Sequence, residues 1–279
     1  MQLSNIVQDV FASLGLGKMY KLTGGSTTTS IDTTETAGTD EGTIIIVTDA
    51  GGLGAAPEGE FARITGFASG TSTWTHDTLT VAPAAGDYAM VCNNDVPLFD
   101  MIECVNRGLE KLGYFDLVDT TTLDTASSQT EYAAAVAWKY NKPSQIDIQT
   151  NTGDSNDNRW KAITDWEYVP AGANSTGLLI LGEQPTASRD LRIWYRGLHP
   201  RVSTFSAYIR EEIAPELIRQ ATLLECLNLI LSQTGRGVDP QVIQDRNSAA
   251  VEFERAKAMF PIRHLPTHSK LLIVGDLGQ

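Results

Sequence analysis

Residues 213–231, IAPELIRQATLLECLNLIL, carry apolar side chains over more than half the circumference of a helix. A helix that is apolar nearly all round needs more than one packing partner. The next stretch, DPQVIQDRNSAAVEFERAKAMF at residues 239–260, begins with an N-cap aspartate and a proline, and its apolar residues recur at helical spacing. Together these segments predict an antiparallel helical hairpin within residues 201–260.

Two shorter segments show the same helical spacing and are predicted to complete a bundle with that hairpin. The first lies within residues 1–17 and the second within residues 96–113, where Pro97 opens the helix. We expect the N-terminal helix to pack on its own domain, the commoner outcome, and the alternative is an arm that docks on a neighbouring chain. The apolar positions are Leu3, Ile6, Val7, Val10, Phe11 and Leu14 in the first segment, and Leu98, Met101, Ile102, Val105, Leu109 and Leu112 in the second.

Much of the remaining sequence alternates apolar and polar residues with period two, which is typical of β-strands. In residues 18–95, short strands separated by turn-rich pieces predict a small antiparallel barrel or sandwich, with residues 24–38 as an exposed loop. Residues 114–200 predict an antiparallel sandwich in which Trp160, Trp166 and Trp194 anchor the core. The predicted fold class is therefore α+β: a small antiparallel helical bundle with β-barrel or β-sandwich insertions.

The composition is that of a folded, acidic protein. The 279 residues include 34 Asp and Glu against 21 Lys and Arg, a net charge of −13. Because an acidic chain is repelled by phosphate backbones, free DNA or RNA is not expected as an equilibrium ligand. No apolar run approaches the ~20 residues that span a bilayer, and the N-terminus lacks the pattern of a secretory signal peptide. Cys92, Cys104 and Cys226 are expected to be buried thiols in a reducing compartment.

The two ends of the chain differ in charge. Residues 1–95 hold 11 acids and three bases, whereas residues 190–270 hold nine acids and 11 bases. Such a difference suits head-to-tail packing of subunits, and the alternative is that each face is simply solvated. Arg192, Trp194 and Arg196 alternate along one predicted strand, so they share a face and can stack. The two arginines are candidate interface residues, or else a surface ladder that covers Trp194.

The sequence lacks the motifs of catalysis and metal binding. It contains no phosphate-binding loop with a lysine, no cysteine pair at zinc-ligand spacing and no serine-hydrolase elbow. We therefore expect no enzyme, no cofactor and no metal site. A hydrolase acting on cell wall or glycan stays an alternative and would need paired carboxylates in a cleft. The candidate carboxylates for hydrolysis are Glu58, Glu60, Asp154 and Asp157. The candidate metal ligands, without a third ligand nearby, are His264 and His268.

The C-terminal residues 261–279 are predicted to form an extended arm. Residues 271–274 are four consecutive apolar residues, and burial of each would contribute about 1.5–3 kcal/mol. They either add a strand to the chain's own sheet or dock on another subunit as an added strand. The predicted partner-binding residues are thus Leu271, Leu272, Ile273 and Val274, together with Arg192 and Arg196.

The order of these parts resembles a class of virion proteins. The features that carry the resemblance are the N-terminal helix, GTIIIVTD at residues 42–49, VAPAAGDY at residues 81–88, DVPLFDMIECVNRGL at residues 95–109, LRIWYR at residues 191–196, and the helix pair after Ile213. In this order they are similar to tailed-bacteriophage virion proteins, most of all the head-to-tail connector (adaptor) proteins that form a ring beneath the portal. The likeness spans most of the chain.

This resemblance implies a structural virion protein at the head–tail junction, assembled in the host cytoplasm and without a membrane. It implies a homo-oligomeric ring, twelve-fold in symmetry, that contacts the portal protein and tail or stopper proteins. DNA would be only transient cargo in the lumen, where an acidic wall lets it slide. The helices within residues 213–260 would form the ring, and residues 271–274 would dock on the portal.

The β-module at residues 18–95 is larger than minimal adaptors carry, so other virion roles stay open. These are a tail-tube, tail-completion or decoration role. The main alternative is a tail or decoration protein with a carbohydrate-binding or adhesive β-domain, which the strand-rich middle and its tryptophans would suit.

Overall fold

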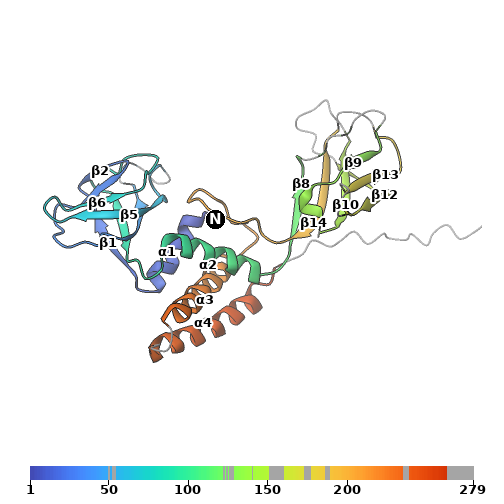
Figure 1. The fold of residues 1–279 in the computed structure, drawn as a ribbon. Coiled ribbons are helices and arrows are strands. Elements are labelled where there is room, and N and C mark those ends of the chain that lie inside the picture. The colour runs from blue at the N-terminus through green and yellow to red at the C-terminus, as the bar shows by residue number, and fades with distance from the viewer. Residues whose placement is uncertain are drawn as a thin grey trace, which may run out of the picture. The chain divides into compact units, whose positions relative to one another are not determined.

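The computed structural model describes residues 1–49, 51, 55–121, 123, 125, 129–139, 141–150, 160–172, 177–185, 189–234 and 239–262. These residues form a mixed α+β fold with four α-helices and three antiparallel sheets, which confirms the predicted class (Figure 1). The chain divides into two compact units. Unit 1 joins Met1–Gly113 to Pro200–Ile262, and the described part of unit 2 lies within Tyr114–His199.

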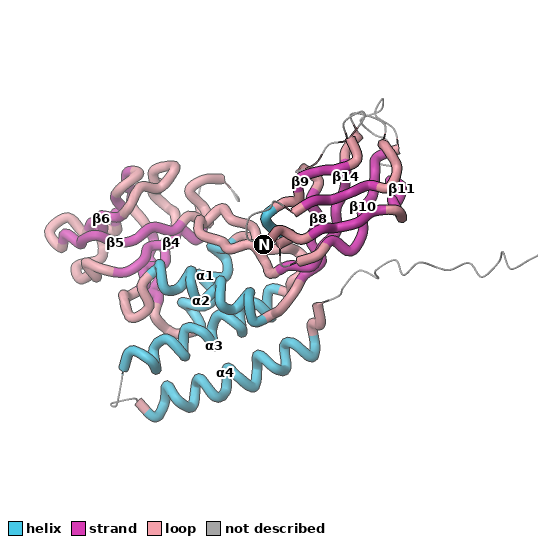
Figure 2. The backbone as a smooth tube through the Cα atoms, turned by 45° about the vertical axis from the view of Figure 1, so that its right-hand side comes forward, coloured by secondary structure: helices cyan, strands magenta, loops and turns pink. Residues whose placement is uncertain are grey.

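The helices of unit 1 are α1 (Leu3–Ser13), α2 (Leu98–Lys111), α3 (Pro215–Thr234) and α4 (Pro240–Met259). All four were expected from their apolar spacing. The central helix is α3, which packs against α1, α2 and α4 (Figure 2). This arrangement explains why α3 is apolar on most of its circumference, since it has neighbours on several sides.

Local sequence features set how these helices begin and how closely they pack. The predicted cap of α4 is confirmed, because the Asp239 carboxylate accepts a hydrogen bond from the Gln241 amide at 2.9 Å. In α2, a Cβ at Gly108 would lie 3.2 Å from the Thr222 backbone nitrogen of α3. Glycine therefore lets the two helix backbones approach closely. The Lys111 ammonium also forms an ion pair with the largely buried Glu225 of α3.

Unit 1 also contains a seven-stranded antiparallel sheet with the order β1-β7-β4-β5-β6-β3-β2. Of the two predicted forms, barrel or sandwich, the closed barrel is wrong, because β1 and β2 end this order and are not paired with each other in the described residues. The sheet must nevertheless curl, since only Leu22 and Thr23 separate these two end strands. The strands are β1 (Gly17–Lys21), β2 (Gly24–Ser26), β3 (Thr29–Ile31), β4 (Gly42–Thr48), β5 (Phe61–Ala68), β6 (Thr73–His76) and β7 (Tyr88–Cys92).

One apolar core lies inside the curled sheet. It includes Trp74 of β6, Ile44 of β4 and Leu22 at the sheet's end, all essentially without exposed surface. Residues 24–38 were expected to be an exposed loop, but they contain β2 and β3. These are outer strands that need few buried apolar residues, and threonine favours β-structure. The buried Ser30 hydroxyl of β3 lies 3.0 Å from Nε2 of His76, which joins the outer strands to β6.

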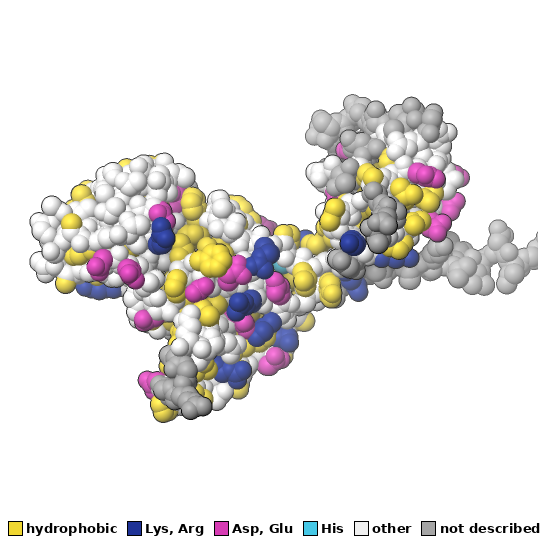
Figure 3. Space-filling model, viewed as in Figure 1, with side chains coloured by type: hydrophobic (Ala, Val, Ile, Leu, Met, Phe, Trp, Pro, Cys, Tyr) yellow, Lys and Arg dark blue, Asp and Glu magenta, His cyan; other side chains and the backbone are white. Residues whose placement is uncertain are grey.

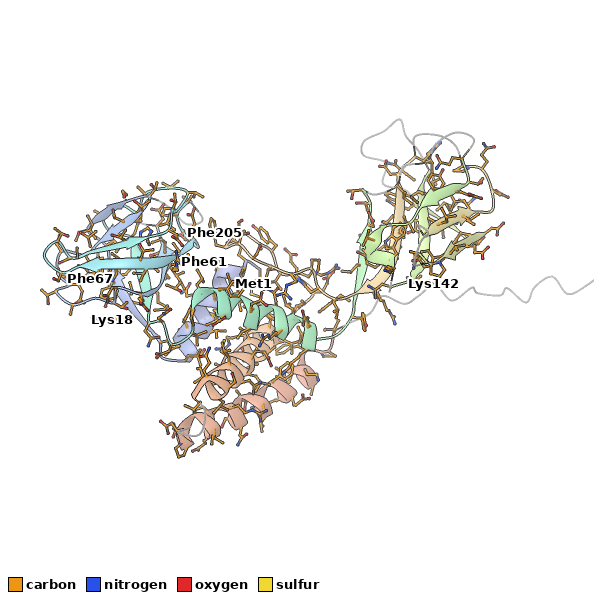
Figure 4. All side chains as sticks on the ribbon, in the orientation of Figure 1. Met1, Lys18, Phe61, Phe67, Lys142 and Phe205 are labelled. Atoms are coloured by element: carbon orange, nitrogen blue, oxygen red, sulfur yellow. The ribbon has the colours of Figure 1, made fainter. Side chains whose placement is uncertain are left out.

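The segment before α3 joins the sheet to the helices within unit 1. Phe205 meets Phe61 of β5 edge to face, with ring centroids 5.8 Å apart (Figure 4). The N-terminus lies against the same segment, where the Ile209 amide donates to the Met1 carbonyl at 2.7 Å. The expectation that the N-terminal helix packs on its own domain is therefore confirmed, because α1 also contacts α2 and α3.

Unit 2 holds two antiparallel sheets that share one core. The four-stranded sheet has the order β11-β10-β14-β8, and the three-stranded sheet has the order β12-β13-β9. Ile146 and Ile193 from the first sheet and Leu179 from the second pack into the common core. The strands are β8 (Phe115–Asp119), β9 (Glu131–Ala133), β10 (Pro143–Gln149), β11 (Trp160–Ile163), β12 (Trp166–Val169), β13 (Leu178–Leu181) and β14 (Leu191–Gly197), with a 3₁₀ turn at Val136–Trp138.

The tryptophans of unit 2 differ in part from the expectation. Trp138 is fully buried in the core and the half-buried Trp166 packs against it as expected, whereas Trp160 and Trp194 are half-buried and are not part of that core. Strand alternation explains why Trp194 is outside the core. On β14 the side chains of Leu191 and Ile193 point into the core, so those of the alternate residues point away from it. Trp194 therefore points to the opposite, outer face of the four-stranded sheet.

Candidate functional site

The outer face of the four-stranded sheet in unit 2 brings the predicted arginines together with a buried carboxylate. Asp147 on β10 lies opposite Arg192 on β14 in the strand register. One oxygen of Asp147, Oδ2, accepts hydrogen bonds from Nη2 and Nε of Arg192 at 3.0 and 3.1 Å and from Nε1 of Trp194 at 2.8 Å. The other oxygen accepts from Nε2 of Gln145 at 2.7 Å. This group is called the Asp147 cluster below.

Arg192 also stacks on aromatic rings. Its guanidinium carbon lies 4.6 Å from the ring centroid of Trp160 and 5.2 Å from that of Trp194. The side chain of Asp147 is only 4% exposed and that of Arg192 29% exposed, so this ion pair is largely removed from water. A buried carboxylate with several donors and a stacked guanidinium is a satisfied structural arrangement. We infer that Arg192 stabilises the sheet, which agrees with the alternative in which the arginines form a surface ladder over Trp194.

Arg196 has a different environment on the same face. Its Nε lies 3.1 Å from Oδ1 of Asp116 on β8, and its side chain is 49% exposed. Pairs so accessible to water contribute little stability. Arg196 is therefore the more accessible of the two predicted interface arginines.

In the described part of the chain, the carboxylates considered for hydrolysis accept hydrogen bonds that hold loops in place. Glu60 is buried and accepts hydrogen bonds from the Thr80 backbone amide at 2.7 Å and from the Thr80 hydroxyl. This contact ties the loop that contains Thr80, which lies outside the strands, to the residue just before β5. Glu58 accepts from the Asp49 amide at 3.3 Å. The other two carboxylates, Asp154 and Asp157, lie outside the described residues.

Other chemically distinctive groups of unit 1 are buried and partnered. The His76 ring donates from Nδ1 to the Asp77 carbonyl at 2.8 Å, and burial lowers its pKa. Burial raises the pKa of the Cys92 thiol to about 12. All three cysteines are buried and free of disulfides, as expected. Across the residues that the structure describes, no cluster of three metal-ligating side chains occurs, and His264 and His268 lie outside them.

The basic charge of the C-terminal third is largely paired within unit 1. Figure 3 shows Lys and Arg side chains mixed with Asp and Glu over the helices. Arg201 binds Glu103 of α2 at 2.5 Å, and Arg219 binds Glu216 on α3 at 2.7 Å. Hydrogen bonds from these arginines hold the pKa values of both glutamates below their usual range. These residues therefore present a mixed surface and not a basic face.

A groove between helices in unit 1 is large enough to receive a partner segment. It has a volume of about 730 Å³ and lies between the end of α1, the second half of α3 and the first half of α4. Half-buried aliphatic side chains form its floor. Its acids are Asp95, Asp245 and Glu252, and no lining residue is Lys or Arg. We call it the α1–α3–α4 groove; its aliphatic lining is Leu14, Leu16, Leu223, Leu227, Ile230 and Val242.

The helix α4 also carries apolar side chains on the face turned away from α3. At about 100° per residue, Ile243, Val251 and Ala258 fall within an arc of about 80°. They are exposed, and Val251 is 67% exposed, whereas the buried residues Ala249 and Phe253 lie on the roughly opposite side. A shallow hollow of about 510 Å³ runs along this face beside Ile243 and Val251. We call Ile243, Asn247, Val251 and Ala258 the outer α4 face.

Sequence reasoning found neither the groove nor the outer α4 face. The apolar repeat of α4 signalled a core helix, and Ile243 and Val251 were the available sign of a second face. The groove depends on three helices distant in sequence, so no local pattern predicts it. The arm residues Leu271, Leu272, Ile273 and Val274 lie outside the described residues.

Comparison with known proteins identifies no family. No protein-family model matches the chain, and no curated protein matches it. Among the described helices, none combines the length and apolarity needed to cross a membrane.

Proposed function

We propose that this protein is a structural component of a tailed-bacteriophage virion, a head-to-tail connector that assembles as a closed ring. Its described surface carries an apolar helix face and an apolar groove, whereas Glu58, Glu60 and His76 are hydrogen-bonded within the fold. The role is therefore assembly and not catalysis. Neighbouring copies in the ring contact each other through their helices, and the ring contacts a portal protein and tail or stopper proteins.

The outer α4 face is the observation that carries this proposal. A surface helix normally carries one apolar stripe toward its own core, with polar residues opposite. Here Ile243 and Val251 are exposed on the face opposite the buried Ala256, at 45% and 67% exposure. They share this arc with the polar Asn247 and Glu254, and exposed apolar side chains rimmed by polar residues mark interaction sites. A second copy packed on this face would remove both side chains from water.

The proposed ring requires that the outer α4 face meets a different face of the next copy. The helix α3 packs against both α2 and α4, so the two outer helices lie on different sides of it. Different faces can then meet between successive copies, which makes the contact heterologous. Heterologous contacts close into rings when the rotation between copies allows it. In this proposal the helices are an antiparallel bundle, and the two β-rich regions are insertions carried by it.

The net charge supports passage of DNA without binding to it. The chain carries 13 more acids than bases. A lumen lined by acidic side chains repels phosphates, so DNA would slide through as transient cargo. Twelve-fold symmetry, the position at the head–tail junction and assembly in the host cytoplasm follow from the resemblance of the sequence to connector proteins.

Mass photometry of the purified protein, alone and mixed with a portal protein, tests this proposal. We expect a species much heavier than the 30.2-kDa chain and a joint complex with the portal. Only single chains in both samples would refute the connector role.

A carbohydrate-binding or adhesive role is the second candidate, favoured by the half-buried Trp160 and Trp194 on the outer sheet face of unit 2. Aromatic rings of this kind can stack on sugars, but Arg192 already lies over both rings. A glycan array tests the idea directly. Silence across the array would remove it, whereas binding that Trp160→Ala abolishes would support it over the connector role.

A further inference from the structure

The α1–α3–α4 groove has a chemistry that selects its occupant. Its lining includes aliphatic side chains, with Leu223 and Ile230 half-buried, and three acids at its rim without a lining base, although Glu252 also pairs with the exposed Arg255 of α4 at 3.7 Å. Its volume of about 730 Å³ falls within the range of binding pockets, ~300–1,000 Å³. A fitting occupant is therefore a short segment that combines aliphatic side chains with positive charge.

One such segment belongs to the chain itself. Residues 263–279 hold Arg263 and Lys270 against one acid, Asp276, whereas the whole chain is strongly acidic. Lys270 directly precedes the aliphatic run of residues 271–274. An aliphatic run preceded by a base complements an aliphatic floor with an acidic rim in both respects.

The course of α4 favours a donor in another copy. The groove uses Val242 to Glu252 of α4, but the chain leaves this helix at Met259. At about 1.5 Å per residue, Met259 lies roughly 10 Å beyond Glu252 and 25 Å beyond Val242. To fill its own groove, the chain would have to reverse direction after α4. A segment from a second copy needs no reversal.

We propose that the α1–α3–α4 groove of one copy binds residues 270–274 of a second copy. Leu271, Leu272, Ile273 and Val274 cover the aliphatic floor, and Lys270 meets the carboxylates of the rim. This assignment rests on the proposed self-assembly, because the donor is a second copy. It gives the arm a neighbouring subunit as its partner, where the resemblance implied the portal.

Peptide binding tests the chemistry of the groove. The probe is a fluorescein-labelled peptide of residues 262–279, and the acceptor is the full-length Leu272→Asp chain, whose own arm cannot compete. We expect saturable binding by fluorescence anisotropy. Asp245→Lys in the acceptor should weaken binding about tenfold, and a peptide carrying Lys270→Glu should recover part of that loss. Glu254→Lys is the matched control, since this exposed residue of α4 does not line the groove.

Mixing two variants tests whether the donor is a second copy. One full-length chain carries Asp245→Lys with Glu252→Lys, so its groove is blocked and its arm is intact. The other carries Leu272→Asp, so its arm is blocked and its groove is intact. Both chains also carry Val251→Lys, so that contacts through the outer α4 face do not assemble them. We expect native mass spectrometry to find a one-to-one complex in the mixture that neither variant forms alone.

Each alternative result overturns the assignment in a distinct way. Peptide binding without a mixed complex would mean that the arm fills its own groove. Absence of saturable peptide binding, or equal binding to the Asp245→Lys and Glu254→Lys acceptors, would show that the groove does not bind the arm. If wild type still forms large assemblies in that case, the groove assignment fails while the proposed function stands.

Discussion

Removal of the Asp147 carboxylate should destabilise unit 2 far more than removal of the Asp116 carboxylate on the same sheet face. Asp147→Ala leaves the Arg192 guanidinium, the Trp194 indole N–H and the Gln145 amide without the acceptor that all three use. Asp116→Ala removes the partner of the accessible Arg196. The two substitutions therefore delete the same chemical group in two environments.

The burial of each pair sets the expected magnitude. Loss of one partner of a fully buried ion pair costs about 3–5 kcal/mol. Because Arg192 keeps 29% of its side chain exposed, water can partly resolvate it, and we expect about 3 kcal/mol for Asp147→Ala. A pair as accessible as Asp116–Arg196 is worth about 1 kcal/mol or less.

Double-mutant cycles measured by urea unfolding of the full chain separate each pair from its surroundings. The first cycle combines Asp147→Ala with Arg192→Met, and the control cycle combines Asp116→Ala with Arg196→Met. Unfolding is followed by far-UV circular dichroism, because Trp194 fluorescence itself responds to these changes. We expect a coupling free energy of about 2 kcal/mol for the first pair and below about 1 kcal/mol for the second.

Equal coupling in the two cycles would refute this reasoning. So would an Asp147→Ala variant with the unfolding midpoint of wild type. Either result would mean that the Asp147 cluster does not stabilise the sheet. The alternative interpretation of Arg192, as a residue that binds a partner, would then be favoured.

Three further predictions concern unit 1. Asn106→Ala should destabilise the fold by about 2–4 kcal/mol in chemical denaturation, because the Asn106 amide bonds both the carbonyl and the N–H of Val202 at 2.9 and 2.8 Å; an unchanged midpoint would contradict this. Burial lowers the pKa of His76 in the folded state, so the unfolded chain takes up the proton first. Stability should therefore fall as the pH drops from about 6.5 toward the lower folded pKa, and His76→Gln should flatten that dependence. The native Cys92 thiol, with a pKa of about 12, should resist a thiol reagent at pH 8 until urea unfolds the chain, whereas immediate labelling would exclude its burial.

The elements that sequence predicts best are the ones whose burial is periodic. The helices α1 to α4 each carry a long apolar repeat, and the structure places all four where the repeats lie. The strand β8 was not predicted, because Phe115 and Leu117 are its two buried residues and the helix before it ends only four residues earlier. Residues 160–169 form two strands, β11 and β12, which belong to different sheets. A break of two residues inside an apolar pattern leaves little signal.

The candidate site was predicted only in part for a similar reason. Alternation of Arg192, Trp194 and Arg196 correctly placed them on one face of a strand. Their partners come from strands far away in sequence, and Asp147 alone gave no sign that it would be buried beneath Arg192. Pairing between distant strands is a property of the tertiary fold, so the burial of Asp147 could not be inferred locally.

Mass photometry of two valine variants tests the central claim most directly. Val251→Lys places a charge on the outer α4 face, and Val136→Lys makes the same change at an even more exposed valine in unit 2, at 89% exposure. Neither side chain belongs to a core, so both variants should fold. We predict that wild type and Val136→Lys assemble to the same mass, well above the 30.2-kDa chain, while Val251→Lys does not reach that mass. Assembly of Val251→Lys to the same mass as wild type would contradict the claim that copies meet through α4.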